Sequence, residues 1–201
     1  MNDAPETSDA LPDPPIGHPP GQGRFGPTID RFDEAADAWL ERFRGMPALD
    51  RIMVSATRAG EFSAIWHTAS IARGLLKGRP DQIIGLTVGI GLESLIVNQG
   101  LKRIFHRPRP TREGDERFEI RRPLTSSFPS GHASAAGFAA ITFIGWDGPR
   151  FAPLWATVAA TVAASRPYVR IHHASDVIAG VAVGIAMGLG ARQVFERLGL
   201  S

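Results

Sequence analysis

The 201-residue sequence has no cysteine, which excludes a disulfide scaffold, a thiolate nucleophile and a cysteine-ligated zinc or iron–sulfur site. It has little net charge, because 22 Lys and Arg stand against 20 Asp and Glu. This balance argues against a nucleic-acid binder that works by neutralising phosphates alone. The sequence also lacks any apolar–polar alternation long enough to build a sheet, and it has no internal repeat. The absence of such alternation, together with the helical segments described below, predicts an all-α fold, and the length suits one compact domain.

The charges are unevenly distributed along the chain. Residues 1–50 hold four basic and ten acidic side chains, so residues 51–201 carry a net charge of +8. The segment 102–129 alone holds eight basic and four acidic residues. By itself such a loop is typical of a solvated connection or of a patch attracted to anionic lipid.

The N-terminal 27 residues contain seven of the sixteen prolines and almost no large apolar side chain, a composition typical of a disordered tail. Their acidic start lacks the basic and apolar regions of a secretory signal. Over residues 28–44 apolar side chains recur at three- and four-residue steps, which predicts an amphipathic helix on a membrane surface. We therefore assign 1–27 to the tail and 28–201 to one helical domain.

Five apolar segments follow the amphipathic helix. The second holds a single charge, Glu93, and its twenty residues match a hydrocarbon core of about 30 Å. In the fifth, Gly180, Gly184 and Gly188 share one helical stripe, and this spacing lets helices pack closely in lipid. The pattern predicts an integral membrane bundle of about five transmembrane helices, with the core of a soluble bundle as the alternative. The segments are residues 52–76, 82–101, 133–146, 151–165 and 177–191.

The first chemical motif is Pro129-Ser130-Gly131-His132, immediately before the third apolar segment. A helix that begins here offers free backbone N–H groups and a positive dipole end, which together bind anions. His132 adds a group that titrates near neutral pH.

The second motif follows the fourth segment. His172 and Asp176 are four residues apart, so on a helix they would share a face, and the carboxylate would fix one ring tautomer and leave the other nitrogen nucleophilic. His173 and Asp176 also have a helical spacing, so local spacing does not choose between the two histidines. A surface His–Asp pair or a zinc site would use the same residues, although no convincing further ligands are present.

An up-and-down helical bundle brings these motifs to one end. Lys102 and Arg109 follow the second segment, residues 129–132 precede the third, and residues 166–176 join the fourth to the fifth. Alternate connections of such a bundle lie on the same side. Cations, a helix N-terminus, two histidines and an aspartate at one place predict phosphate-ester hydrolysis by a covalent histidine route.

Taken together, the motifs resemble those of the type 2 phosphatidic acid phosphatase and vanadium haloperoxidase superfamily. The signature of that family is K-x6-R-P, then P-S-G-H, then S-R-x5-H-x3-D. The resemblance covers residues 102–176, and no signature position departs from it. The three motifs stand here at Lys102 to Arg109-Pro110, at Pro129-Ser130-Gly131-His132, and at Ser165-Arg166 to His172 and Asp176.

The resemblance implies a role for each matching residue. His172, and not His173, would be the nucleophile that forms a phosphohistidine, and Asp176 would orient it. His132 would protonate the leaving group and then activate water. No metal or cofactor is implied. The residues expected to bind the phosphate oxygens are Lys102, Arg109, Ser130, Gly131 and Arg166.

The function implied by the resemblance is a membrane lipid phosphatase acting on a phosphatidate-like lipid or a polyprenyl diphosphate. Its partners would be the lipid substrate and the bilayer, with no nucleic acid. We expect an inner-membrane protein with an outward-facing active site, although a count of basic residues alone favours the cytoplasmic side. The alternatives are a soluble acid phosphatase, a vanadate-dependent haloperoxidase, or a catalytically silent lipid-phosphate binder. Arg103, Arg107 and Arg170 match no motif position, and we predict that they contact solvent or lipid headgroups.

Overall fold

The computed structural model describes residues 24–111, 115–120 and 125–200. Every regular element in these ranges is a helix, which confirms the all-α prediction for this part of the chain. Most of the predicted disordered tail lies outside the described residues, as do two short parts of the basic loop.

The third and fourth apolar segments, residues 133–146 and 151–165, correspond within three residues to helices of the structure. Proline occupies the first position of α1, α2 and α4, where its fixed φ suits a helix and its missing N–H costs nothing. In chain order the elements are α1 (Pro27–Glu41), α2 (Pro47–Ala59), the 3₁₀ turn η1 (Glu61–Ser63), α3 (Ala64–Lys77), α4 (Pro80–Ser94), the π-helical η2 (Leu95–Leu101), α5 (Lys102–Ile104), α6 (Gly131–Asp147), the 3₁₀ turn η3 (Pro149–Phe151), α7 (Ala152–Tyr168) and α8 (Ala174–Arg197).

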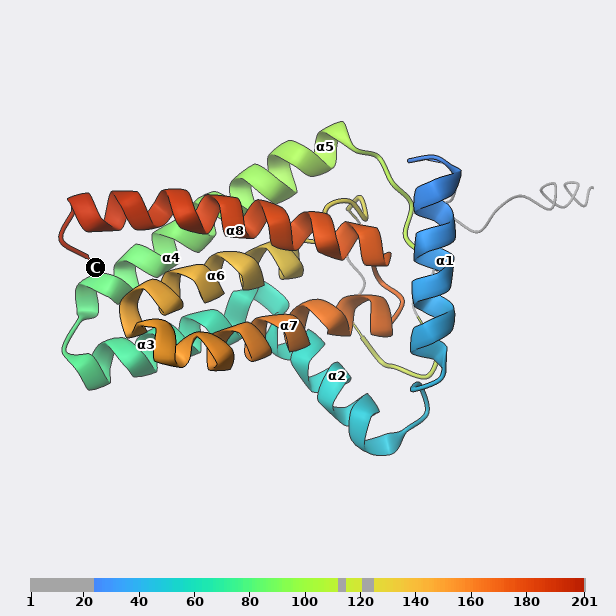
Figure 1. Ribbon diagram of the computed structural model, residues 1–201, viewed down its shortest axis with the longest axis horizontal. Helices are drawn as coiled ribbons and strands as arrows, with labels where there is room; N and C mark the ends of the chain where they lie inside the picture. Colours follow the sequence, from blue (N-terminus) through green and yellow to red (C-terminus); the bar gives the residue numbers. More distant parts are fainter. Residues whose placement is uncertain (1–23, 112–114, 121–124, 201) are drawn as a thin grey trace, which may run out of the picture.

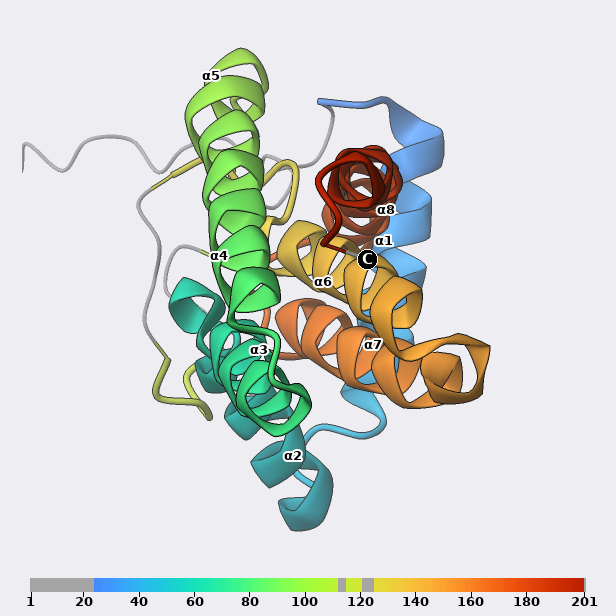
Figure 2. The same cartoon turned by 90° about the vertical axis from the view of Figure 1, so that its left-hand side faces the viewer.

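Five helical stretches form a bundle with α6 at its centre. Figure 1 shows α3, α4, α6, α7 and α8 running in roughly the same direction, with α1 crossing their right-hand end. Seen along the bundle in Figure 2, α6 lies in the middle of the other four. Nearly every residue from Ala133 to Phe143 is buried, and a helix that is apolar on all sides belongs in such a central place.

The glycine stripe of α8 lies against α6, as its spacing predicts. A Cβ atom at Gly184 would stand 1.9 Å from the carbonyl oxygen of Ser134, and one at Gly180 would stand 2.4 Å from that of Ser130. Only glycine allows the two backbones to approach this closely.

Replacing Gly184 by alanine should therefore destabilise the protein. The new methyl group meets backbone that cannot move aside, so we expect a loss of about 1–3 kcal/mol and a lower thermal midpoint in detergent. Gly190→Ala on the same helix is the matched control, because nothing lies within 4 Å of the added atom. Equal midpoints for the two variants would contradict the close packing of α6 and α8.

The outer surface of the bundle is apolar. Leu75, Leu76 and Ile84 are among many large apolar side chains that are exposed, Leu76 to 86%, whereas Gln82 and Glu93 are buried. An exposed apolar surface of this kind marks a membrane or protein contact. Among the described residues, two helical stretches are long and apolar enough to cross a membrane by length and composition, namely Pro80–Ile104 and Ala174–Arg197.

The first apolar segment is not one helix, contrary to the sequence pattern. It is divided into α2 and α3 at η1, where Phe62 and Ser63 have φ values of 51° and 58°. Gly60 ends α2 against the active-site end of α6, and a Cβ there would stand 2.6 Å from Cδ2 of His132. The turn thus lies beside a residue 72 positions further along the chain, and local hydropathy does not record such a neighbour.

Candidate active site

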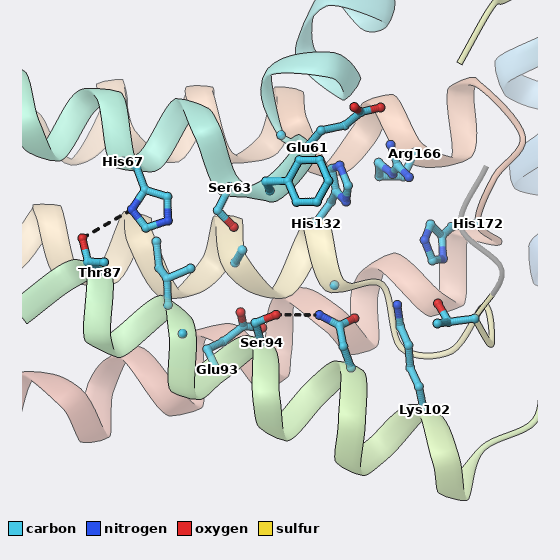
Figure 3. A pocket seen from close by; sticks show the side chains of 18 residues that line it. Glu61, Ser63, His67, Thr87, Glu93, Ser94, Lys102, His132, Arg166 and His172 are labelled. Atoms are coloured by element: carbon cyan, nitrogen blue, oxygen red, sulfur yellow. Dashed lines mark hydrogen bonds between the residues drawn. The ribbon is translucent and has the colours of Figure 1, made fainter. Parts of the chain in front are cut away.

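The three motifs meet at the end of the bundle nearest α1. They border a cavity of about 610 Å³ between α3, α4 and α6. Figure 3 shows Lys102, His132, Arg166 and His172 pointing into one end of this cavity. Gly131 also lines it. The other predicted residues, Arg109, Ser130 and Asp176, are not among the residues that line the cavity.

His172 is placed at the cavity by the short connection between α7 and α8. Its side chain is buried, with 3% of the residue exposed, and burial lowers the pKa of the ring to about 3. Its Nδ1 lies 3.6 Å from Oδ2 of Asp176, and its Nε2 lies 3.2 Å from Nη1 of Arg109. The ring is therefore neutral at physiological pH, and its Nε2 is held beside a cation that can bind phosphate.

Asp176 faces His172 by a different geometry from the one its spacing suggests. The helix α8 begins at Ala174, so the two residues do not share one helix face. Instead, Asp176 lies in the first turn and its Oδ2 accepts hydrogen bonds from the backbone N–H of His173 at 2.8 Å and from the hydroxyl of Ser127. His173 contributes its backbone here, and its ring does not line the cavity.

Arg107 is the residue that the sequence analysis missed. It was expected at the surface, and that prediction is wrong: the residue is only 2% exposed. Its guanidinium donates to Oδ1 of Asp176 at 2.6 Å and to Oδ2 of Asp33 on α1 at 2.7 Å. Arg107 thus holds the far side of the carboxylate that faces His172. The only sequence signal for it is the repeated Arg-Pro dipeptide at 107–110.

Two of the three predicted phosphate-binding cations have a buried nitrogen without a hydrogen-bond partner. Arg166 reaches Thr57 of α2 with one terminal nitrogen, and Arg109 donates to the carbonyl of Ile171 at 2.8 Å. Within the described part of the chain, the Nε atoms of Arg109 and Arg166 and Nε2 of His132 are buried without a hydrogen-bond partner. Buried polar atoms in this state require an explanation, and a phosphate in the cavity would supply one for Arg166 and His132, which line it.

Ser130 and Gly131 start α6, as the motif predicts. Ser130 is the N-cap, and its hydroxyl accepts from the backbone N–H of Ala133 at 3.5 Å. Its side chain is fully buried and does not line the cavity, so the geometry gives it a capping role. Gly131 opens the helix at the cavity wall, where a Cβ would stand 2.9 Å from Oδ1 of Asn98.

The charge imbalance along the sequence is explained at α1. Arg170, also expected at the surface, donates to Asp37 at 2.9 Å and to Glu41 at 3.0 Å. Hydrogen bonds from Arg117 and Arg44 lower the pKa of Glu41 to about 2. The acidic N-terminal helix is thus paired with arginines of the basic region around the site. Arg103, by contrast, is exposed and donates to Gln99 at 2.8 Å, as predicted.

No group of three or more histidine, aspartate and glutamate residues is arranged to hold a metal ion in the ranges that the structure describes. The cavity does contain polar residues that the motifs do not include. Glu93 and Ser94 enter from α4, Asn98 from η2, and Glu61 and Ser63 from η1.

The comparisons with known proteins agree with the motifs. A family model described as the PAP2 superfamily matches residues 82–199. No curated protein matches the sequence. One similar solved structure is described as the first transmembrane PAP2-type phosphatidylglycerolphosphate phosphatase, from Bacillus subtilis; it has 20% identity and a TM-score of 0.67, with 86% of this chain and 88% of that chain covered.

Another similar structure is Aquifex aeolicus LpxE, with 21% identity and a TM-score of 0.66 over 85% of this chain and 98% of that chain. At these identities the two structures establish a shared fold. The family model covers more than half of the sequence and includes all three motifs, so the chain belongs to the PAP2 superfamily and is a phosphoric-ester hydrolase.

Proposed function

We propose that this protein is a membrane lipid phosphatase that hydrolyses a lipid phosphomonoester or diphosphate through a phosphohistidine, without a metal. The observation that carries the proposal is the buried, neutral His172, which opens onto a cavity with Lys102 and Arg166 and has Asp176 behind it. A neutral imidazole beside fixed cations suits nucleophilic attack on a phosphate.

The chemistry follows from these positions. Nε2 of His172 attacks phosphorus, the bond from phosphorus to the lipid oxygen breaks, and His132 donates a proton to the departing oxygen. His132 then removes a proton from a water molecule, which attacks the phosphohistidine and releases inorganic phosphate and the histidine. The developing negative charge is stabilised by Lys102, Arg109, Arg166 and the backbone N–H groups at the start of α6.

We further propose that five helical stretches cross the membrane: α3, α4 with its continuation to α5, α6, α7 and α8. Their common direction (Figure 1) and their apolar outer surface support this arrangement. The helix α1 would lie along the membrane surface at the catalytic end. This end would face outward from the inner membrane. The exposed apolar surface favours a membrane enzyme over a soluble phosphatase.

The proposal predicts phosphate release that resists chelation. Purified protein in detergent should release phosphate from at least one of phosphatidate, phosphatidylglycerophosphate and a polyprenyl diphosphate, because the proposed nucleophile and cations are all side chains. Addition of EDTA should leave the rate within about twofold, since no step needs a metal Lewis acid. A loss of activity in EDTA that returns with a divalent metal would contradict the mechanism.

A further inference from the structure

The cavity extends well beyond the phosphate-binding end. In Figure 3, His172, Lys102 and Arg166 lie at one end and His67 and Thr87 lie at the other, with Glu93 and Ser94 between them. A phosphate held by the cations would fill only the first part of this space. The remainder must receive the group to which the phosphate is esterified.

The remaining part of the cavity is lined by an ionisable residue, Glu93, which is unusual for a helix of this composition. It lies in the α4–α5 stretch that is apolar enough to cross a membrane, yet the residue is 1% exposed and faces the cavity. Its neighbour Leu92 is 55% exposed on the outer surface. An ionisable residue within a membrane helix is costly and marks a functional position.

One oxygen of this carboxylate is poorly satisfied by the protein. Among the described residues, Oε1 of Glu93 is buried without a well-formed hydrogen bond, although the hydroxyl of Ser134 on α6 interacts with this carboxylate. The wall beside it is also polar, because Asn98 donates to the hydroxyl of Ser94 at 2.9 Å. Oδ1 of Asn98 in turn lies against the start of α6 at Gly131. A polar surface therefore runs from the phosphate-binding end to Glu93.

We infer that Glu93 accepts a hydrogen bond from a hydroxyl of the group esterified to the phosphate, so that the enzyme prefers a glycerol- or sugar-like headgroup phosphate. A hydrocarbon chain in this place would leave the buried carboxylate with only Ser134 and Lys102 as partners, whereas a substrate hydroxyl donates a further hydrogen bond to it. Phosphatidate, which has no free hydroxyl, and polyprenyl phosphates offer no such donor. This inference rests on the proposed phosphatase function and specifies its substrate class.

Lys102 also interacts electrostatically with Glu93, so the carboxylate could instead act as a counter-charge for that lysine. The two roles differ in what they do to different substrates. A counter-charge affects every phosphate ester equally, because the cation contacts the phosphate itself. A headgroup acceptor affects only substrates that bring a hydroxyl.

The test is the ratio of kcat/KM for two lipids with identical acyl chains, phosphatidylglycerophosphate and phosphatidate, in mixed micelles. We expect the wild-type enzyme to prefer the hydroxylated lipid by about tenfold or more. Glu93→Met removes the acceptor at similar length and should lower kcat/KM for phosphatidylglycerophosphate much more than for phosphatidate, so that the ratio falls to about one. Glu93→Gln retains a carbonyl acceptor and should keep part of the preference. Leu92→Met is the matched control and should leave both values unchanged.

Each result decides between the alternatives. An equal loss of kcat/KM on both lipids in Glu93→Met and Glu93→Gln would show that Glu93 acts as the counter-charge of Lys102. That result would overturn the inference. A wild-type enzyme that prefers phosphatidate, or hydrolyses both lipids equally, would overturn it without any variant. A wild-type protein that releases phosphate from neither lipid nor from a polyprenyl diphosphate would instead contradict the phosphatase function.

Discussion

Replacing His172 by alanine should reduce kcat by about 10³-fold or more, because the variant has no atom to accept the phosphoryl group. The other cavity residues, including Lys102 and Arg166, remain in place, so substrate binding should be much less affected than turnover. The measurement is phosphate release under saturating lipid, with the thermal midpoint recorded to show that the variant folds.

The nucleophile can also be identified directly. Rapid acid-free quenching of the enzyme with ³²P-labelled substrate should give an alkali-stable phosphohistidine on wild-type protein and none on His172→Ala. Arg103→Ala is the control, because this exposed residue bonds only to Gln99 among the contacts that the structure shows; its activity should stay close to that of the wild type. Label that persists in His172→Ala, for example on His173, would contradict the assignment.

Replacing Arg107 by alanine should produce the second-largest effect. Two buried carboxylates, Asp176 and Asp33, would lose the cation between them, and such a loss costs about 3–5 kcal/mol. In the proposed mechanism Asp176, which lies 3.6 Å from Nδ1 of His172, orients the nucleophile, so kcat should also fall by about 10²-fold. The measurements are thermal unfolding in detergent and steady-state kinetics of the same preparation.

A double-mutant cycle with Asp33→Asn separates these effects. If Arg107 joins the two carboxylates, Asp33→Asn should destabilise the wild type more than it destabilises Arg107→Ala. Arg107→Lys keeps the charge but not the forked geometry, so it should restore stability more than kcat. An Arg107→Ala variant as active and stable as Arg103→Ala would show that the buried network does not support the site.

The helical segments were predictable because their signals are local. Apolar periodicity, prolines at helix starts and the Pro-Ser-Gly-His turn lie within a few residues of the elements that they define, so residues 133–146 correspond closely to α6 (Gly131–Asp147). Two of the five segments, residues 82–101 and 177–191, lie within helical stretches that are long and apolar enough, by length and composition, to span a membrane. The total of about five spans remains a prediction.

The motif residues were predictable in type but not in geometry. The spacing of His172 and Asp176 suggested a shared helix face, whereas the helix begins between them. The break at η1 lies beside the close approach of Gly60 to His132. In both cases the local backbone geometry goes with tertiary packing, and the spacing of residues along the chain does not encode that packing.

The sequence by itself determined the helical class, the family, and the identity of the histidines and cations at the site, because these depend on hydropathy and on motifs read along the chain. Only the tertiary structure decided which other charges support them. Arg107 acts with Asp33, 74 residues away, and Glu93 faces the cavity rather than lipid. The physical reason is that a buried charge is stabilised by whatever the fold brings against it, and those partners come from distant segments.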